Sequence, residues 1–290
     1  MRILVTIPHF FARHPESSSG SRRYDSERAK LPKRKAAVEQ CLRALHQLFG
    51  TQQSILNIAD RKLQPAPTSG ATVLHVVVCT TRDQQLLDEL PFQAPWFQHH
   101  PTDIDPRTLG FHCRRVLRDR WGNYDFYGYL EDDLIIQDPW WFAKLAWFSQ
   151  HVGDEKLLLP NRFELSPNLD STVHKLYIDG DLAPRVTARF QDVADTPQLT
   201  GHVLGQPVVF RRPLNPHAGC YFLNARQMEY WIRQPYFLDG DTSFVGPLES
   251  AATLGVMRAF KIYKPAHEHT NFFEVLHHGT SFLSLVRGLS

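Results

Sequence analysis

The sequence predicts an α/β fold, in which a mixed, mostly parallel sheet is flanked by helices and forms a single domain. Two runs of β-branched and aliphatic residues, RILVTI (2–7) and TVLHVVVCT (72–80), are typical of strands buried on both faces of a parallel sheet. Segments with helical spacing of apolar residues alternate with such strands, and this alternation indicates right-handed crossovers. A chain of 290 residues readily encloses one core.

The first half of the chain contains the clearest elements. Pro8 ends the first predicted strand, and Gly50 is a typical C-cap for the first helix. Asp138 and Pro139 form an N-cap and N1 pair that opens a later helix. In chain order, the sequence predicts strands at 2–7, 54–59, 72–80, 125–130 and 156–161, helices at 33–49, 103–121 and 140–152, and loops at 16–23 and 60–70.

The second half has a looser pattern, with many turn residues between 165 and 205. Its short apolar runs indicate a smaller, mixed region that continues the same domain. The predicted strands are at 174–179, 206–212, 219–224 and 258–264, and the predicted helices are at 225–234 and 248–256.

Composition and charge exclude several classes of protein. The net charge of +2 does not suggest a nucleic-acid partner. Lys and Arg gather at 21–35, either as a solvated loop and helix start or as an anion-binding edge for phosphate. No apolar run approaches membrane-spanning length, which leaves peripheral membrane contact open. The four cysteines are widely spaced, as expected for reduced thiols in a cytoplasmic protein: Cys41, Cys79, Cys113 and Cys220.

Three consecutive acids interrupt the most hydrophobic segment of the chain, FYGYLEDDLIIQDPWW (126–141). Burying an unpaired carboxylate is costly, so Glu131, Asp132 and Asp133 must leave the sheet at its carboxyl end, meet counter-charges or bind a cation. Ligands of open α/β sheets bind at the carboxyl ends of the strands. Mg²⁺ and Mn²⁺ prefer one or two carboxylates together with phosphate oxygens. The triplet therefore favours a cation site beside a diphosphate over acids that only cap a turn.

The segment YLEDDLIIQDPWWF resembles the DxD-type motif of glycosyltransferases with the GT-A fold, a Rossmann-like architecture. It is similar in particular to the Glu-Asp-Asp form in the N-acetylglucosaminyltransferase family that starts hybrid N-glycans. In that family, too, a hydrophobic strand precedes the acids, and two apolar residues and a short helix follow them. The resemblance implies that Asp133 ligates a divalent metal, Mn²⁺ or Mg²⁺, and that Glu131 and Asp132 face a nucleotide-sugar.

Other segments fit the same plan. The resemblance implies that the nucleoside base lies at the end of the first strand and that an arginine opens the first long helix. The second strand and a later helix would also flank the nucleotide. The residues at these positions are the expected donor contacts: Pro8, His9, Phe10, Arg34, Thr80, Asp83 and Arg114.

The second half is expected to supply a carboxylate that takes a proton from the acceptor hydroxyl. Glu249, at the start of the last predicted helix, is the first candidate for this catalytic base, and Asp241 is the second. The family's pattern has paired aspartates at this point, whereas this chain has Leu-Glu-Ser. The alternative for Glu249 is a first-turn acid that complements the helix dipole.

A late segment, KPAHEHTNFFEVLHHG (264–279), resembles the loop that closes over the donor in the same family. Imidazole nitrogens suit transition metals such as manganese. The resemblance implies that His269 binds the metal or a phosphate, with His277 and His278 as weaker candidates.

These features predict a metal-dependent glycosyltransferase of the hexosyl- or N-acetylhexosaminyltransferase class. Residues 1–160 would form the nucleotide-sugar-binding half of one catalytic domain. Residues 161–290 would form the acceptor-binding half, with the catalytic base and the closing C-terminal loop. The expected donor is a UDP-sugar, and the expected acceptor is a hydroxyl group of a saccharide, lipid-linked or protein substrate. Transfer is expected to invert the anomeric centre.

Three other functions fit the sequence less well. A sugar-nucleotide pyrophosphorylase-like enzyme would carry a glycine-rich loop after the first strand, but TIPHFFARHPE (6–16) has no glycine. A glycoside hydrolase could use Glu131 with a second acid, but barrel-like repetition is missing from the sequence. A non-catalytic nucleotide-sugar-binding protein would bind the donor without metal dependence or turnover.

Overall fold

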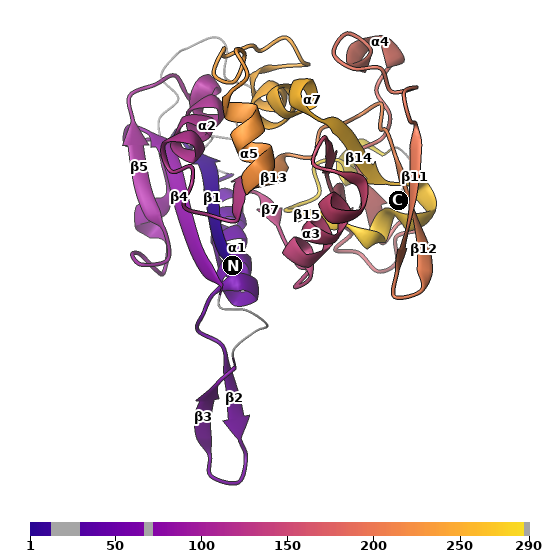
Figure 1. Cartoon of the computed structure of the whole chain (residues 1–290). Helices are drawn as coiled ribbons and strands as arrows, with labels where there is room; N and C mark the ends of the chain where they lie inside the picture. The colour runs from indigo at the N-terminus through magenta and orange to yellow at the C-terminus, as the bar shows by residue number, and fades with distance from the viewer. Residues whose placement is uncertain (13–29, 67–71, 287–290) are drawn as a thin grey trace.

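The computed structural model describes residues 1–12, 30–66 and 72–286. A five-stranded sheet in the order β13-β6-β1-β4-β5 occupies one side of the molecule, at the left in Figure 1. Its four neighbouring strands β6, β1, β4 and β5 are parallel, and β13 runs antiparallel to β6 at one edge. The predicted mixed, mostly parallel sheet is therefore confirmed. The strands are β1 (Arg2–His9), β4 (Val73–Thr81), β5 (Gln98–Thr102), β6 (Phe126–Leu130) and β13 (Cys220–Asn224).

The two long crossovers of this sheet run in opposite directions. The chain passes from β1 through α1 (Leu31–Phe49) to β4, and later through α2 (Leu109–Asp119) to β6 on the other side of β1. Right-handed crossovers in opposite directions place their helices on opposite faces of a sheet. The strand order thus reverses between β1 and β6, and such a reversal opens a crevice at the carboxyl ends of the two strands. The apolar stripe that predicted α1 is buried: Ala37, Val38, Cys41, Leu42, Leu45 and Phe49.

Two further sheets of four strands make up most of the second half, in the orders β10-β9-β15-β7 and β11-β12-β14-β8. The late strand β15 is inserted between β9, to which it is parallel, and β7, to which it is antiparallel. This insertion places β15, which is the last strand of the described chain, beside β7, which follows the acid triplet. The strands are β7 (Leu134–Ile135), β8 (Lys156–Leu158), β9 (Asn161–Leu165), β10 (Lys175–Tyr177), β11 (Gln198–Val203), β12 (Gln206–Arg211), β14 (Lys261–Pro265) and β15 (Glu274–His277).

The remaining helices are mostly short. The helix predicted over 103–121 begins only at Pro106, because the Asp105 side chain accepts a hydrogen bond from the backbone N–H of Arg107 at 2.8 Å and so caps the turn. The helix expected over 248–256 is a composite with a π-helical middle, labelled η4 (Ser250–Leu254). The other segments are α3 (Trp141–Val152), α4 (Pro184–Thr187), α5 (Ala225–Ile232), α6 (Pro247–Glu249), α7 (Gly255–Ala259), and the 3₁₀ turns η2 (Leu87–Glu89), η3 (Pro106–Thr108), η5 (His267–Phe272) and η6 (Leu283–Leu285).

A small hairpin, β2 (Ser54–Asn57) with β3 (Lys62–Pro65), projects away from the body of the molecule (Figure 1). The sequence predicts a strand for the first of these segments and a loop for the second. In the described part of the chain, no helix has both the length and the apolar character required to cross a bilayer. All four cysteines are buried and unpaired, as expected for reduced thiols.

Candidate active site

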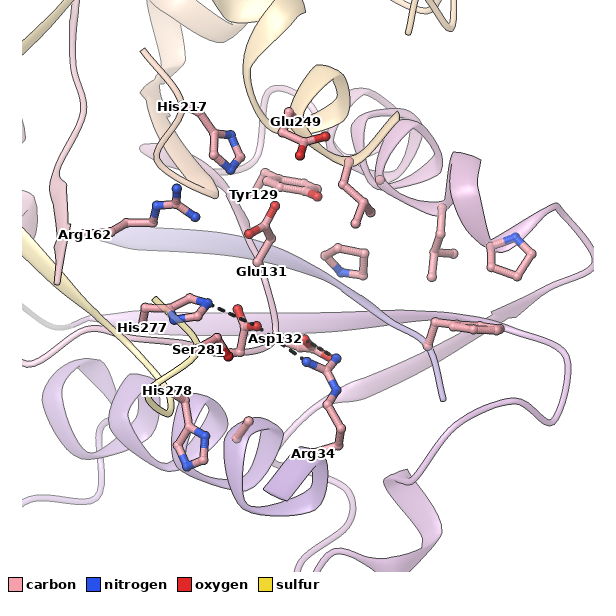
Figure 2. Close-up of a pocket in the computed structure, with 18 of the residues that line it drawn as sticks. Arg34, Tyr129, Glu131, Asp132, Arg162, His217, Glu249, His277, His278 and Ser281 are labelled. Carbon is pink, nitrogen blue, oxygen red and sulfur yellow. Dashed lines mark hydrogen bonds and ion pairs between the residues drawn. The ribbon is translucent and has the colours of Figure 1, made fainter. Parts of the chain in front are cut away.

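A cavity of about 430 Å³ lies at the carboxyl ends of β1 and β6, where the strand order reverses. Its walls come from five parts of the chain: the end of β1, the start of α1, η3 with the start of α2, the end of β6 with the acid triplet, and the second half. Figure 2 shows side chains of all these parts converging on one space. The lining residues used below are Pro8, Phe10, Lys33, Arg34, Tyr129, Glu131, Asp132, Asp133, Arg162, His217, Glu249, His277, His278, Ser281 and Phe282.

Asp132, the middle acid of the triplet, is tied to the protein by both carboxylate oxygens. The Nη2 group of Arg34 donates to Oδ1 at 2.7 Å and to Oδ2 at 2.8 Å. His9 Nδ1 lies 2.6 Å from Oδ2, while its Nε2 accepts a hydrogen bond from the backbone N–H of Leu86. The ring proton is therefore on Nδ1, which donates to Asp132. Burial acts to raise the pKa of Asp132, but Arg34 and His9 outweigh it, and the pKa is lowered.

This arrangement bears on two predicted donor contacts. His9 lies wholly buried behind Asp132 and does not line the cavity. Asp132 lines the cavity, but its oxygens are engaged by Arg34 and His9. The contacts of Asp132 with His9 and Arg34 thus fix the end of β1, the start of α1 and the end of β6 relative to one another.

Asp133, the last acid, has a side chain that is 25% exposed, against 8% for Asp132, and it lines the cavity. Arg34 Nη1 lies 3.5 Å from its Oδ2, and His277 Nε2 lies 3.7 Å from the same oxygen. Its backbone carbonyl accepts a hydrogen bond from the N–H of His278 at 2.8 Å, so the late segment of the chain holds it from behind. Asp133 therefore presents a carboxylate to the cavity between two basic side chains.

Glu131, the first acid, is in a different state. Burial raises the pKa of its carboxyl group to about 8, with Asp133 as the next contribution and Arg162 acting in the opposite direction. A carboxyl group with this pKa is mostly protonated at neutral pH and can donate a hydrogen bond. Gly219 packs against it, since a Cβ built there would lie 2.5 Å from Glu131 Oε2. The backbone φ of +63° at Gly219 also favours glycine.

Arg162 belongs to a buried group of charges behind the cavity. Its Nε donates to Asp179 Oδ1 at 2.8 Å, and Lys264 Nζ donates to Asp179 Oδ2 at 2.7 Å. Burial opposes the ionisation of Asp179, but Arg162 and Lys264 outweigh it and lower its pKa to about 2. One carboxylate thus faces two cations, which leaves excess positive charge next to Glu131 and Asp133.

His277 lies between Asp133 and the buried acid Glu164. Its Nδ1 lies 3.0 Å from Oε1 of Glu164, which is fully buried. Glu164 also accepts hydrogen bonds from the backbone N–H groups of Phe282 and Leu283, at distances of 2.8–3.1 Å. Glu164 therefore fixes both the His277 ring and the following turn, which places Ser281 and Phe282 in the wall of the cavity.

Glu249 and His217 form one part of the wall contributed by the second half, and both point toward Tyr129 and Glu131 in Figure 2. Glu249 is the last residue of α6, directly before the π-helical turn. Nδ1 of His217 lies 2.9 Å from Oγ1 of Thr253 in that turn. Burial lowers the pKa of His217 well below its ordinary value, and Arg162 adds to the effect, so the imidazole is neutral.

The predicted site residues divide into those that meet at the cavity and those that do not. Seven line it: Pro8, Phe10, Arg34, Glu131, Asp132, Asp133 and Glu249. Lys33 lines it too, so the described end of the basic run reaches the site, while residues 13–29 lie outside the described part of the chain.

The other predicted residues are directed elsewhere. The Thr80 hydroxyl contacts His99, and Asp83 is an exposed turn residue. Asp241 caps its own loop by accepting from the N–H of Ser243, and His269 Nδ1 accepts from the N–H of Val209. Arg114 is buried, and it donates two hydrogen bonds to backbone carbonyls. The structure thus does not bring Thr80, Asp83, Arg114, Asp241 or His269 to the cavity.

The sequence did not indicate several of the residues that line the cavity. Tyr129 has the sequence context of an ordinary strand residue. Arg162 in β9 and His217 in a loop belong to no recognisable motif. His277 was a weaker candidate than His269 because spacing alone did not reveal that β15 pairs with β7. Only the topology brings these side chains together.

Within residues 1–12, 30–66 and 72–286, no group of three or more His, Cys, Asp or Glu side chains is arranged to hold a metal ion. Asp133 and His277 provide two candidate ligands. Their separation of 3.7 Å is larger than a hydrogen bond. The second nitrogen of His277 is held by a carboxylate, an arrangement that is common for metal-bound histidine.

Comparisons with known proteins find only distant structural similarities. No family model and no curated protein matches this sequence. Among solved structures, the chain is similar to S. aureus TarS 1–349 in complex with UDP, with 10% identity, a TM-score of 0.42 and coverage of 91% of this chain and 57% of that chain. The chain therefore spans little more than half the length of that structure.

Two other similar structures cover more of their own chains. One is glucosyl-3-phosphoglycerate synthase from Mycobacterium tuberculosis in complex with Mg²⁺ and UDP, with 12% identity, a TM-score of 0.43 and coverage of 98% of this chain and 73% of that chain. The other is CMP:2-keto-3-deoxy-manno-octonic acid synthetase complexed with CTP, with 13% identity, a TM-score of 0.39 and coverage of 100% and 98%. At these values the activity of the chain has to be argued from its own site.

Proposed function

We propose that the protein is a metal-dependent glycosyltransferase that transfers a sugar from a nucleotide-sugar, in particular a UDP-sugar, to a hydroxyl acceptor with inversion. The observation that carries the proposal is the position of Asp133. It presents a carboxylate at the carboxyl end of β6, next to Arg34 and His277, on the same cavity as Glu249. The Glu-Asp-Asp motif at this position would make the chain similar to the N-acetylglucosaminyltransferase family.

Asp133 and His277 would hold the divalent metal, Mn²⁺ or Mg²⁺, and His277 takes over the role that the sequence suggested for His269. The donor set fits, since a carboxylate and an imidazole suit Mn²⁺ and the cavity leaves room for phosphate oxygens. Glu164 would keep the His277 ring in the orientation needed for a ligand. When bound, the metal would stabilise negative charge on the departing diphosphate.

Three basic side chains at the mouth of the cavity would bind the diphosphate of the donor. Lys33 and Arg34 come from the first turn of α1, and His278 lies next to the metal ligand His277. Arg34 would be held in place by Asp132, which leaves its Nη1 directed toward Asp133. Residues 1–160 would thus supply most of the donor site, and residues 161–290 would supply the acceptor site.

Glu249 would act as the catalytic base, and Asp241 is the weaker choice because it caps its own loop near Arg258. Glu131, with its pKa of about 8, would remain protonated and donate a hydrogen bond to a substrate hydroxyl. The neutral His217 beside Glu249 would accept or donate a hydrogen bond without adding charge. Glu249 would then remove the proton, and the protonated Glu131 would only donate a hydrogen bond.

The test is a thermal-shift screen of nucleotide-sugars with and without Mn²⁺, followed by product analysis. A ligand that binds the native state raises the melting temperature. The proposal expects metal-dependent stabilisation by a UDP-sugar and release of UDP when a suitable hydroxyl acceptor is added. Release of pyrophosphate from a nucleoside triphosphate would instead identify a nucleotidyltransferase. Binding without metal dependence or turnover would identify a binding protein.

A further inference from the structure

Arg114 is a buried cation without a buried acid beside it. Its side chain is only 1% exposed, and no carboxylate of the described residues lies within ion-pair distance of it. It is sandwiched between the rings of Phe111 and Trp231, with its Cζ 4.8 and 5.4 Å from their centroids. Burial lowers the pKa of Arg114, so this position costs free energy that a neutral side chain would not. Such a residue calls for a role beyond packing.

Arg114 interacts with the hydroxyl of Tyr221, and its two hydrogen bonds to backbone carbonyls are directed at the π-helical turn after Glu249. Its Nη2 donates to the carbonyl of Ser250 at 2.7 Å and to that of Ala251 at 2.8 Å. These are the first two residues of the π turn, and Glu249 directly precedes them. Because the guanidinium is planar and rigid, it fixes the direction of both carbonyls at once.

Close packing of α2 and of Arg114 against the turn leaves it little room to move. A Cβ at Gly110 of α2 would lie 2.6 Å from the Cβ of Ala251, and a Cβ at Gly255 would lie 3.1 Å from the guanidinium of Arg114. The turn is also bound from the other side, where the Ser250 hydroxyl donates to the carbonyl of Phe244 at 2.9 Å. The π turn is therefore held on two sides by specific contacts.

A π turn contains about one residue more than an α turn, since its hydrogen bonds run from i to i+5 instead of i+4. Each residue of an α-helix adds a rotation of roughly 100° about the helix axis. With α7 as the reference, the extra residue of the π turn therefore rotates the Glu249 side chain about this axis by one such step. Glu249 then lines the cavity, and Thr253 of the same turn contacts the cavity residue His217. The widened turn thus determines where both side chains of this wall lie.

We propose that Arg114 is a positioning residue for Glu249: it stabilises the π-helical turn and thereby aims the carboxylate into the cavity. This inference rests on the proposed function, in which Glu249 is the catalytic base. It replaces the sequence-based expectation that Arg114 contacts the nucleotide. In this role Arg114 acts through the backbone of Ser250 and Ala251 and does not touch the substrate.

The experiment compares Arg114→Met, Arg114→Lys and the control Phe237→Leu, which perturbs the packing of Trp231 without touching the two carbonyls. Arg114→Met is expected to lower kcat about 100-fold, the lower range for loss of a general base, with the KM for the donor within about twofold. Arg114→Lys keeps a donor and is expected to retain at least about a tenth of kcat. An equal loss of kcat in Arg114→Met and Phe237→Leu would overturn the proposal.

A double-mutant cycle with Glu249→Gln is the stricter test. If Arg114 acts through Glu249, adding Arg114→Met to Glu249→Gln is expected to cause no further loss of kcat beyond about twofold. Additive losses would contradict the proposal. Should Arg114→Met fail to fold, deletion of Ala252 tests the same turn by removing its extra residue, and wild-type transfer by that variant would equally overturn the proposal.

A readout that needs no turnover separates this inference from the proposed function. Hydrogen exchange of the backbone amides at 246–254 is expected to be faster in Arg114→Met than in the wild type and unchanged in Phe237→Leu. A wild-type protein without transfer activity would refute the proposed function alone. Unchanged exchange in Arg114→Met would refute the role of Arg114.

Discussion

Arg34 and Asp132 form a fork in which one guanidinium nitrogen lies 2.7 and 2.8 Å from the two carboxylate oxygens, across 98 residues of the chain. Both side chains are largely buried, at 17% and 8% exposure. The pair joins the first turn of α1 to the end of β6. Since the other two acids of the triplet lie on either side of Asp132, this contact sets the geometry of the whole cavity.

Asp132→Asn is expected to destabilise the fold by about 3–5 kcal/mol, because it removes the acid of a largely buried ion pair with Arg34. Chemical denaturation at pH 7 measures the change. Glu39→Gln is the matched control, since it breaks a more exposed pair with Arg43 on the same helix and is expected to cost less than about 1 kcal/mol. Equal effects of the two substitutions would contradict this account of the fork.

Glu131 is expected to make stability fall as pH rises. Its pKa is about 8 in the folded state and 4.5 for the isolated side chain, so between these values the folded state holds a proton that the unfolded state has released. The contribution of Glu131 to stability is complete below pH 4.5 and is lost by about pH 8. Glu131→Gln should therefore gain stability relative to the wild type from pH 5 to 8, as thermal unfolding measures. Parallel curves for the wild type and the variant would count against the raised pKa, and the exposed Glu268→Gln serves as the control.

Asp133→Ala is expected to abolish the Mn²⁺-dependent part of the stabilisation by UDP, because it removes the carboxylate that we propose as the metal ligand. His277→Ala is expected to weaken the apparent Mn²⁺ affinity about 10- to 100-fold, whereas His269→Ala should leave it unchanged, since His269 is held by the N–H of Val209. Isothermal titration of Mn²⁺ in the presence of UDP measures all three. Loss of affinity in His269→Ala alone would restore the original assignment.

Glu164→Gln tests whether the buried acid orients His277. An amide keeps the size of the side chain but cannot accept hydrogen bonds on both of its polar atoms, so the contacts to His277, Phe282 and Leu283 cannot all remain. We expect about a tenfold weaker Mn²⁺ affinity and faster proteolysis after residue 277. Wild-type behaviour in both measurements would show that the late segment is held by other contacts.

Glu249→Gln is expected to lower kcat about 10²- to 10⁴-fold without a large change in the KM for the donor, the expected result when only the base is removed. Asp241→Asn is the control, because it lies in a loop away from the cavity and should retain near wild-type kcat. Steady-state assays with saturating donor distinguish the two. A reversed order of effects would assign the base to Asp241.

The strands β1, β4 and β6 and the long helices could be predicted because each has a clear local sequence pattern, whereas no strand was predicted at β5, β11 or β15. The buried runs that became β1, β4 and β6 are continuous in the sequence, and the helical spacing that became α1 is regular. The acid triplet was recognisable for the same reason: three charges in a row contradict the apolar segment around them. Its placement at the carboxyl end of β6 followed from the general rule for open sheets.

The rest of the site depends on contacts between distant parts of the chain. The surroundings of Asp132 and Asp133 depend on residues that are distant in the sequence. Asp132 contacts His9 and Arg34, and Asp133 lies near His277. No local sequence pattern indicates such partners. Arg114 lies on the helix that the sequence placed beside the nucleotide, yet it faces inward because Gly110 lets α2 approach the π turn. Orientation of this kind follows from packing, which periodicity does not specify.

The insertion of β15 between β9 and β7 has a consequence for how the protein matures. A ribosome delivers residues 126–165 before residues 274–277, so the slot between β7 and β9 stays open until residues 274–277 have been made. The nascent polypeptide can thus assemble its five-stranded sheet before this wall of the cavity is complete. Docking of β15 is the step that brings His277 to Asp133.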